Sequence, residues 1–348
     1  MTAARVTVLM PVHNAGRYLR EAVESILGQT FTDFEFLIID DGSTDDSVEI
    51  VRSYHDPRIR LVRNDRNLGL TVSLNKGLGL IESPYVARMD ADDISRPERL
   101  ARQVRFMDAN PGVGVCGSWV RFFSESNHDV WKLPASSEEI RCRQFHTVGV
   151  AHPSVLLRRE LFAEHGLLYD PKCRYSQDFE LWGRAIRLMD FANIQQVLLD
   201  YRMSPRQIGV THGAEQLATA APLRLQRVRE LGLEPTPEQQ KLHEMILNEA
   251  LPPEPAYLER AEQWLLQLEA ANRRAGTYPA GHFSRRLLDI WFSTCLVLAD
   301  ASPRPLRSYL RSPLWSAARA PLWHRARALA AWAVRRGIWQ TVRGPRRR

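Results

Sequence analysis

The 348-residue chain has few cysteines and no long uninterrupted apolar run. Its four cysteines are widely scattered and form no CxxC pair, which argues against a zinc or disulfide framework and favours a reducing cytoplasm. The longest apolar stretch near the C-terminus, residues 290–299, is shorter than the roughly 20 residues that span a bilayer. No P-loop, GxSxG or HExxH pattern appears in the sequence.

The N-terminal residues 1–14 show neither a long apolar core nor a signal-peptide cleavage pattern, and they lead directly into a strand-like segment. We therefore expect a cytoplasmic protein. Lysines and acids are missing from residues 301–348, which hold 12 arginines. Because the whole chain carries +7, its first 300 residues carry a net charge of −5. The basic character belongs to the tail and not to the body.

Strand-like and helix-like patterns alternate over the first part of the chain. The strand-like segments are residues 5–11, 34–40, 58–64 and 85–90, and the helix-like ones are residues 18–30, 45–54 and 71–81. This alternation predicts an α/β fold with a mostly parallel central sheet and flanking crossover helices.

The rhythm changes after about residue 110. Residues 113–123 and 192–203 are typical of strands, residues 154–166 and 176–188 are typical of helices, and the chain beyond residue 214 looks helical. We expect an α/β domain over residues 1–213 and a C-terminal helical region over residues 214–348.

Polar side chains gather where the predicted strands end, and ligands bind at the carboxyl ends of parallel strands. Asp40 and Asp41 follow the second strand, and Asp90, Asp92 and Asp93 follow the fourth. If the strand stays extended, Asp90 and Asp92 alternate onto one side. Two carboxylates there suit Mg²⁺ or Mn²⁺, because the cation relieves their repulsion and can bridge to a diphosphate.

Simpler structural interpretations exist for these motifs. Residues 43–46 and 95–98 each match a helix capping box. An acidic loop can also be merely solvated. Asp178 would lie in the first turn of a helix capped by Ser176, where the helix dipole favours a carboxylate. The capping boxes nevertheless leave Asp40, Asp41, Asp90 and Asp92 without a structural task. Because such acids recur at two neighbouring strand ends, we favour a binding site.

Four segments together resemble the family 2 inverting glycosyltransferases, which have the GT-A fold. They are VTVLMPVHNAGRYLREAVESILGQTFTDFEFLIIDDGSTDDS, NDRNLGLTVSLNKGL, DADD and SQDFELWGR, and the resemblance covers residues 5 to about 205. It implies transfer of a sugar from a nucleotide-sugar donor, most commonly a UDP-sugar, to an acceptor hydroxyl. The acceptor would be a glycan or lipid-linked molecule in the synthesis of cell-surface polysaccharide, lipopolysaccharide or capsule. The alternative is a catalytically inactive binding or scaffold protein with the same fold, against which the complete set of acids argues.

The resemblance also assigns roles to individual residues. The residues that it places at the nucleotide sugar are Pro11, Asn14, Asp40, Asp41, Asn67, Gly69, Asn75 and Asp90. Asp92 would be the direct ligand of a divalent Mn²⁺ or Mg²⁺ ion, with Asp90 beside it at the ribose or a metal-bound water. Asp178 would be the general base that deprotonates the acceptor, a task that suits a positioned carboxylate. Asp93 receives no role.

Three positions depart from the family pattern. His13 stands where many relatives have tyrosine, and Gln177 stands where an acid often precedes the base. Ser204 replaces a histidine that often follows the Tyr-Arg pair. A histidine that closes over the diphosphate is therefore not expected in this register.

The tail, residues 312–348, holds four tryptophans and many arginines. One face of a helix there would carry Leu322, Ala326, Leu329 and Ala333. We expect a basic amphipathic helix that rests on an anionic membrane surface, at the cytoplasmic face of the inner membrane. A helical cap on the catalytic domain is the alternative. Nucleic acid is not an expected partner, because the body has no RNA-binding motif.

Overall fold

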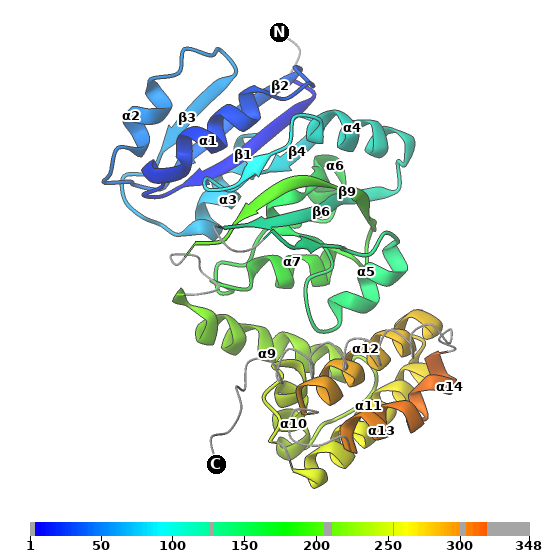
Figure 1. Cartoon of the computed structure of the whole chain (residues 1–348). Helices are drawn as coiled ribbons and strands as arrows, with labels where there is room; N and C mark the ends of the chain where they lie inside the picture. Colours follow the sequence, from blue (N-terminus) through cyan, green and yellow to red (C-terminus); the bar gives the residue numbers. More distant parts are fainter. Residues whose placement is uncertain (1–3, 125–127, 205–210, 253, 299–303, 319–348) are drawn as a thin grey trace, which may run out of the picture. The chain divides into compact units, whose positions relative to one another are not determined.

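The computed structural model divides into two compact units, Met1–Ala220 and Ala221–Arg348 (Figure 1). It describes residues 4–124, 128–204, 211–252, 254–298 and 304–318. Within these residues, no helix combines the length and the apolar character that crossing a bilayer requires.

The first unit is built on one mixed sheet. Its strands are β1 (Val6–Val12), β2 (Phe34–Asp40), β3 (Ile59–Arg63), β4 (Tyr85–Arg88), β5 (Ile94–Ser95), β6 (Val113–Phe123), β7 (Val130–Trp131), β8 (Leu156–Arg158) and β9 (Asp190–Arg202). The order is β3-β2-β1-β4-β8-β6-β9-β5, with β7 paired to β6. Strands β1 to β4 are parallel, as the alternation predicted, and β6 is parallel to β9. The pairings of β5, β7 and β8 are antiparallel.

Helices cover both faces of this sheet (Figure 1). They are α1 (Gly16–Leu27), α2 (Ser47–Arg52), α3 (Leu70–Leu80), α4 (Arg99–Ala109), α5 (Ser137–Gln144), α6 (Arg159–Glu164) and α7 (Gln177–Ala185). Successive strand residues point to opposite faces. Val8 of β1 therefore packs in the core with α1, α2 and α4, while Leu9 packs in the core with α3, α5, α6 and α7. This doubly covered sheet presents the ends of β1, β2 and β4 at one edge.

Residues 154–166 are not one helix, contrary to the prediction from their pattern. A 3₁₀ turn at His152–Ser154 leads into β8, and α6 starts only at Arg159. Strand β8 pairs with both β4 and β6, and its Leu156 and Leu157 enter the two opposite cores. Pairing on both edges outweighs a local helical preference, which is a tertiary effect that a sequence window does not contain.

Neither predicted capping box forms. The Ser43 Oγ accepts a hydrogen bond from the Asn14 amide at 3.0 Å, and α2 starts only at Ser47. Ser95 lies in β5 and pairs with β9, while Glu98 forms an ion pair with Arg102. Ser43 and Ser95, which follow the acids at the ends of β2 and β4, therefore do not cap α2 or α4 as the sequence pattern suggested.

Helix α3 packs closely against β1 at Gly77, where a Cβ atom would lie 2.3 Å from the buried Leu9 Cδ1. We expect Gly77→Ala to destabilise the protein by about 1–3 kcal/mol through overpacking. Gly79→Ala, in the same helix, meets no atom within 4 Å and should stabilise by about 0.5–1 kcal/mol. Thermal melting of both variants checks this, and an equal rise in melting temperature for the two would contradict the packing.

The second unit is helical over its described residues. Its helices are the end of α9 (Gly213–Arg229), α10 (Pro237–Leu247), α11 (Pro255–Ala275), α12 (Ala280–Leu298), α13 (Arg304–Arg311) and α14 (Leu314–Ala318). Thr236 and Gln239 form a complete capping box at the start of α10. Trp264 and Trp291 are buried in this unit's core. The predicted amphipathic face from Leu322 to Ala333 lies outside the described residues.

Candidate active site

Asp41, just beyond β2, ties the loop after β3 to the sheet. Its Oδ1 accepts hydrogen bonds from Asn64 Nδ2 at 2.7 Å and from the Leu68 amide at 2.9 Å, and its Oδ2 accepts from the Gly69 amide at 2.8 Å. Burial would raise the pKa of Asp41, but the hydrogen bonds from Leu68, Asn64 and Gly69 lower it below its ordinary value. The carboxylate is therefore ionised and both of its oxygens are engaged.

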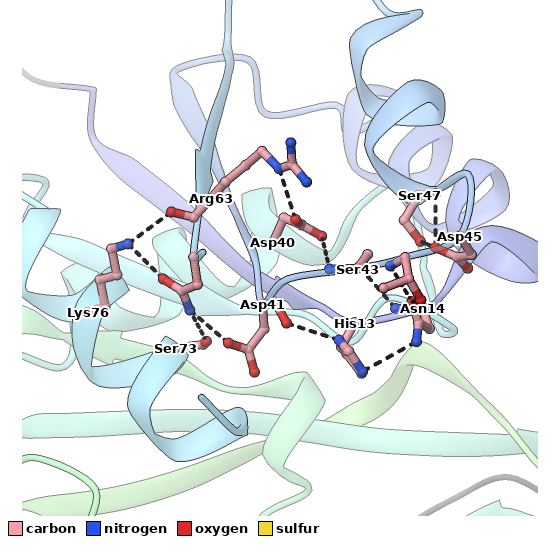
Figure 2. Close-up of polar contacts among 12 residues, drawn as sticks. His13, Asn14, Asp40, Asp41, Ser43, Asp45, Ser47, Arg63, Ser73 and Lys76 are labelled. Carbon is pink, nitrogen blue, oxygen red and sulfur yellow. Dashed lines mark hydrogen bonds and ion pairs between the residues drawn. The ribbon is translucent and has the colours of Figure 1, made fainter. Parts of the chain in front are cut away.

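Asn64 connects Asp41 to Ser73 and Lys76 of helix α3. Figure 2 labels these three partners. The Asn64 Nδ2 also donates to Ser73 Oγ at 2.9 Å, and its Oδ1 accepts from Lys76 Nζ at 2.7 Å. Lys76 in turn donates to the Arg63 carbonyl at 3.2 Å. The ends of β2 and β3 thus form one continuous polar network with the buried Ser73 and the exposed Lys76 of α3.

We expect Asp41→Asn to destabilise the protein by about 1–3 kcal/mol at neutral pH. The NH₂ group of asparagine cannot accept a hydrogen bond, so at least one of the three N–H donors would lose its partner. The folded-state pKa is lowered, so the stabilisation by the carboxylate is present above the ordinary pKa and is lost as the pH falls. Denaturant unfolding at pH 7 measures the loss. Asp65→Asn, at an exposed position of the same loop, is the matched control. Equal stabilities of the two variants would contradict the stabilising role of the Asp41 carboxylate.

Asp40 lies at the end of β2 and is 1% exposed. Its Oδ1 accepts from the Ser43 amide at 3.3 Å, and its Oδ2 accepts from Arg63 Nε at 3.2 Å. These contacts hold the turn between β2 and α2. A contact between Asp40 and the nucleotide stays a prediction.

Asn14 joins the segment after β1 to the segment after β2. Its φ of 49° is in the left-handed region, which asparagine tolerates better than most residues. Its Oδ1 accepts from the Thr44 amide at 2.8 Å. Pro11 is buried within β1, in register with Ile39. The structure thus brings the two predicted residues of the first strand motif to the same edge as Asp41.

The predicted asparagines near α3 have different surroundings. The Asn67 Oδ1 accepts from the Gly69 amide at 3.0 Å, and Gly69 has a φ of 92° that favours glycine at the start of α3. Asn75 instead pairs with the backbone of Tyr169, donating to its carbonyl at 2.8 Å and accepting from its amide at 3.0 Å. Asn75 therefore fastens α3 to the segment that precedes α7.

Asp90, Asp92 and Asp93 form a compact cluster beyond β4. Each offers a carboxylate oxygen, and these oxygens lie within 4.8 Å of one another. Burial, followed by the negative charge of Asp90, raises the pKa of Asp92 to about 6 and that of Asp93 well above its usual range. The Asp93 Oδ2 is buried without a hydrogen-bond partner among the described residues. An all-oxygen set whose charges resist ionising together fits a hard divalent cation.

Two arginines support this cluster and were not predicted. Arg88, 4% exposed in β4, forms an ion pair with Asp90. Arg202 donates from its backbone amide to Asp93 Oδ1 at 2.9 Å and from its Nε to the Asp92 carbonyl at 2.8 Å. The only charged residue in the apolar run 85–89 is Arg88, and this is the one local sign that could have drawn attention to it.

Asp178 lies in the first turn of α7, where it accepts a hydrogen bond from the Phe179 amide at 2.8 Å. Burial raises the pKa of Asp178, although the Phe179 amide and the positive charge of Arg88 oppose the rise. The negative charge of Asp90 adds to the rise in this pKa. Ser176 does not cap the helix with its side chain, which bonds to the Gln216 carbonyl at 3.0 Å. A carboxylate with a raised pKa is suited to accept a proton near neutral pH.

The segment after Ser204, residues 205–210, lies outside the described residues. His212 follows it and stacks on Tyr175 with ring centroids 4.6 Å apart. His212 also forms an ion pair with Glu215 when it is protonated. The structure thus engages this histidine with its own neighbours.

The chain is similar to proteins of known family and fold. Residues 7–166 match the family described as glycosyl transferase family 2. An uncharacterized glycosyltransferase of Haemophilus influenzae is 30% identical over 235 residues, which are 64% of this chain and 73% of the relative.

Two solved structures share the fold. Residues 1–349 of S. aureus TarS in complex with UDP-GlcNAc align with a TM-score of 0.56 at 15% identity, covering 89% of this chain and 88% of that one. The mannosyltransferase PcManGT from Pyrobaculum calidifontis, in complex with GDP-Man and Mn²⁺, aligns with a TM-score of 0.51 at 18% identity, covering 96% and 87%. The predicted GT-A fold is confirmed, and the chain belongs to glycosyltransferase family 2.

Proposed function

We propose that this glycosyltransferase is metal-dependent and inverting, and that it moves a sugar from a UDP-sugar to an acceptor hydroxyl. The observation that carries the proposal is the gathering of acids along one edge of the parallel strands. In the order β2-β1-β4, Asp41 follows the first of these strands and the cluster of Asp90, Asp92 and Asp93 follows the last. A nucleoside diphosphate laid across β1 would meet the Asp41 loop at one end and the cluster at the other.

The nucleoside end of the proposed site is preorganised by hydrogen bonds within the chain. Asp41 holds the loop after β3 by accepting hydrogen bonds from the Leu68 and Gly69 amides. Asn14 joins the segments that follow β1 and β2. Ligand binding then needs little ordering of these loops, which lowers its entropic cost.

The metal would be held by Asp92 and Asp90, as Mn²⁺ or Mg²⁺. When bound, such a cation neutralises the diphosphate and the charge that develops on it as it leaves. The Arg202 backbone amide and guanidinium fix the turn that carries Asp92 and Asp93 against β9. The Arg88 guanidinium, buried beside Asp90, pairs with that carboxylate and fixes its orientation.

The proposed transfer step uses one general base and a single displacement at the anomeric carbon. Asp178 takes the proton of the acceptor hydroxyl, whose oxygen attacks the anomeric carbon on the face opposite the diphosphate. The new C–O bond forms as the bond from the anomeric carbon to the diphosphate oxygen breaks, and the diphosphate leaves with the electron pair. A single displacement inverts the anomeric configuration.

A donor screen tests the proposal. The full chain is incubated with UDP-, GDP- and dTDP-sugars and Mn²⁺, and thermal shift and release of nucleoside diphosphate are recorded. We expect stabilisation by UDP-sugars and not by GDP- or dTDP-sugars, and ¹H NMR of the product should show the inverted anomeric configuration. Retention of configuration would contradict the single displacement, and absence of any response would contradict the proposed donor class.

We also propose residues 1–213 as the catalytic domain, and residues 301–348 as a segment that brings the enzyme to an anionic membrane surface and a lipid-linked acceptor. The arginine content of that segment is the support. Sedimentation with anionic liposomes, for chains with and without residues 301–348, tests the second part. Equal sedimentation of the two chains would contradict it.

A further inference from the structure

His13, directly after β1, has both ring nitrogens engaged by the protein (Figure 2). Its Nδ1 lies 2.9 Å from the Asp41 carbonyl oxygen. Its Nε2 lies 2.9 Å from Asn67 Nδ2 and 3.3 Å from Asn14 Nδ2. One imidazole therefore contacts the segments that follow β1, β2 and β3, which are the three that form the nucleoside end of the proposed site.

The tautomer of His13 follows from these partners. A carbonyl oxygen only accepts, so Nδ1 carries the proton. The Asn67 amide is oriented because its Oδ1 accepts from Gly69, and the Asn14 amide is oriented because its Oδ1 accepts from Thr44. Both asparagines therefore present N–H groups to Nε2, which must be an unprotonated acceptor.

We propose that neutral His13 is a positioning residue that locks the three strand-end segments into the arrangement that binds the nucleoside. The inference rests on the proposed function, because it assigns the nucleotide site to this edge. His13 acts through the Asp41 backbone and Asn67, since the hydrogen-bonding capacity of both its nitrogens is already used. Loss of these bonds should weaken nucleotide binding and leave the chemical step at Asp178 unchanged.

Two variants separate hydrogen bonding from packing. His13→Phe keeps a ring and removes all three hydrogen bonds of the imidazole, whereas His13→Gln keeps a side-chain acceptor and donor. We expect the Phe variant to bind nucleoside diphosphate about tenfold more weakly, as loss of these hydrogen bonds predicts. The Gln variant should stay within about threefold of the wild type, and both should keep the wild-type kcat at saturating donor.

UDP, GDP and dTDP, each with Mn²⁺, are titrated calorimetrically into the full-length wild type and both variants. Unchanged affinity of the Phe variant would overturn the proposal, and so would a Gln variant as weak as the Phe variant. A fall in kcat without a rise in KM would overturn it as well.

A spectroscopic test needs no ligand. Long-range ¹H–¹⁵N spectra of the ¹⁵N-histidine-labelled full chain, with His13→Gln used to identify the signal, report the tautomer directly. We expect a proton on Nδ1 and none on Nε2 at neutral pH, and the opposite tautomer would overturn the inference. If no nucleotide binds the wild type while this tautomer is found, the proposed function fails and the His13 network stands.

Discussion

Asp178→Asn should reduce kcat by about 10²–10⁴-fold, the contribution typical of a positioned general base. The amide has the shape of the carboxylate and can still accept from the Phe179 amide, but it cannot take the acceptor's proton. Binding of the donor should therefore change little. Steady-state kinetics and calorimetric titration of the donor measure the two quantities separately.

Glu180→Gln is the matched control for this prediction. Glu180 also lies in the first turn of α7, where it forms an ion pair with Arg184. Its replacement should leave kcat within about twofold, since it removes only a partly exposed i,i+4 ion pair of small energy. An Asp178→Asn enzyme that keeps more than a tenth of the wild-type kcat would remove Asp178 from the base role.

The raised pKa of Asp178 has a consequence for the pH profile. The base works only when ionised, so kcat should fall as the pH falls through its pKa. Because burial raises that pKa, the fall should begin above the range of an ordinary aspartate. In Asp178→Asn this acid limb should disappear from the residual activity.

Asp92→Asn should have the second large effect, a loss of at least about tenfold in the Mn²⁺-dependent affinity for nucleoside diphosphate. In the metal-free protein the same change should raise the melting temperature at pH 7. The reason is that the pKa of Asp92 is raised to about 6, so its ionised form is disfavoured in the folded state. The stability of the metal-free wild type should accordingly fall as the pH rises between its ordinary pKa and about 6.

Differential scanning calorimetry with and without Mn²⁺ measures both effects of Asp92→Asn: the higher melting temperature of the metal-free variant and its weaker stabilisation by Mn²⁺ with nucleotide. Glu98→Gln is the control, because Glu98 is exposed and pairs only with Arg102 among the described residues. It should retain the wild-type response to Mn²⁺. An Asp92→Asn protein that Mn²⁺ and UDP still stabilise as strongly as the wild type would contradict the metal assignment.

The parallel half of the sheet was predictable because its strands and helices follow one another along the chain. Each of the first strands is a short apolar run, and each crossover helix has a local amphipathic pattern. The antiparallel half was not predictable in the same way. Strand β8 is only three residues long and exists because β4 and β6 flank it, and Ser95 enters β5 because β9 lies beside it. Such pairings depend on partners far away in the sequence.

The same distinction holds within the site. The acids at the strand ends were visible because carboxylates after a buried strand are unusual locally. The task of Asn75 depends on Tyr169, which lies 94 residues away, and that of Asp93 depends on Arg202, which lies 109 residues away. The capping boxes had the correct residues, but Ser43 bonds to Asn14 of another segment instead. Local spacing could not decide between these partners.

We propose that the acids beyond β4 hold a divalent cation through which this glycosyltransferase binds its nucleotide. Calorimetric titration of the wild-type chain with UDP, GDP and dTDP, in Mn²⁺ and then in EDTA, tests it directly. We expect UDP to bind in Mn²⁺ and to lose at least about tenfold in affinity when the metal is removed. Equal affinity in Mn²⁺ and EDTA would contradict the claim.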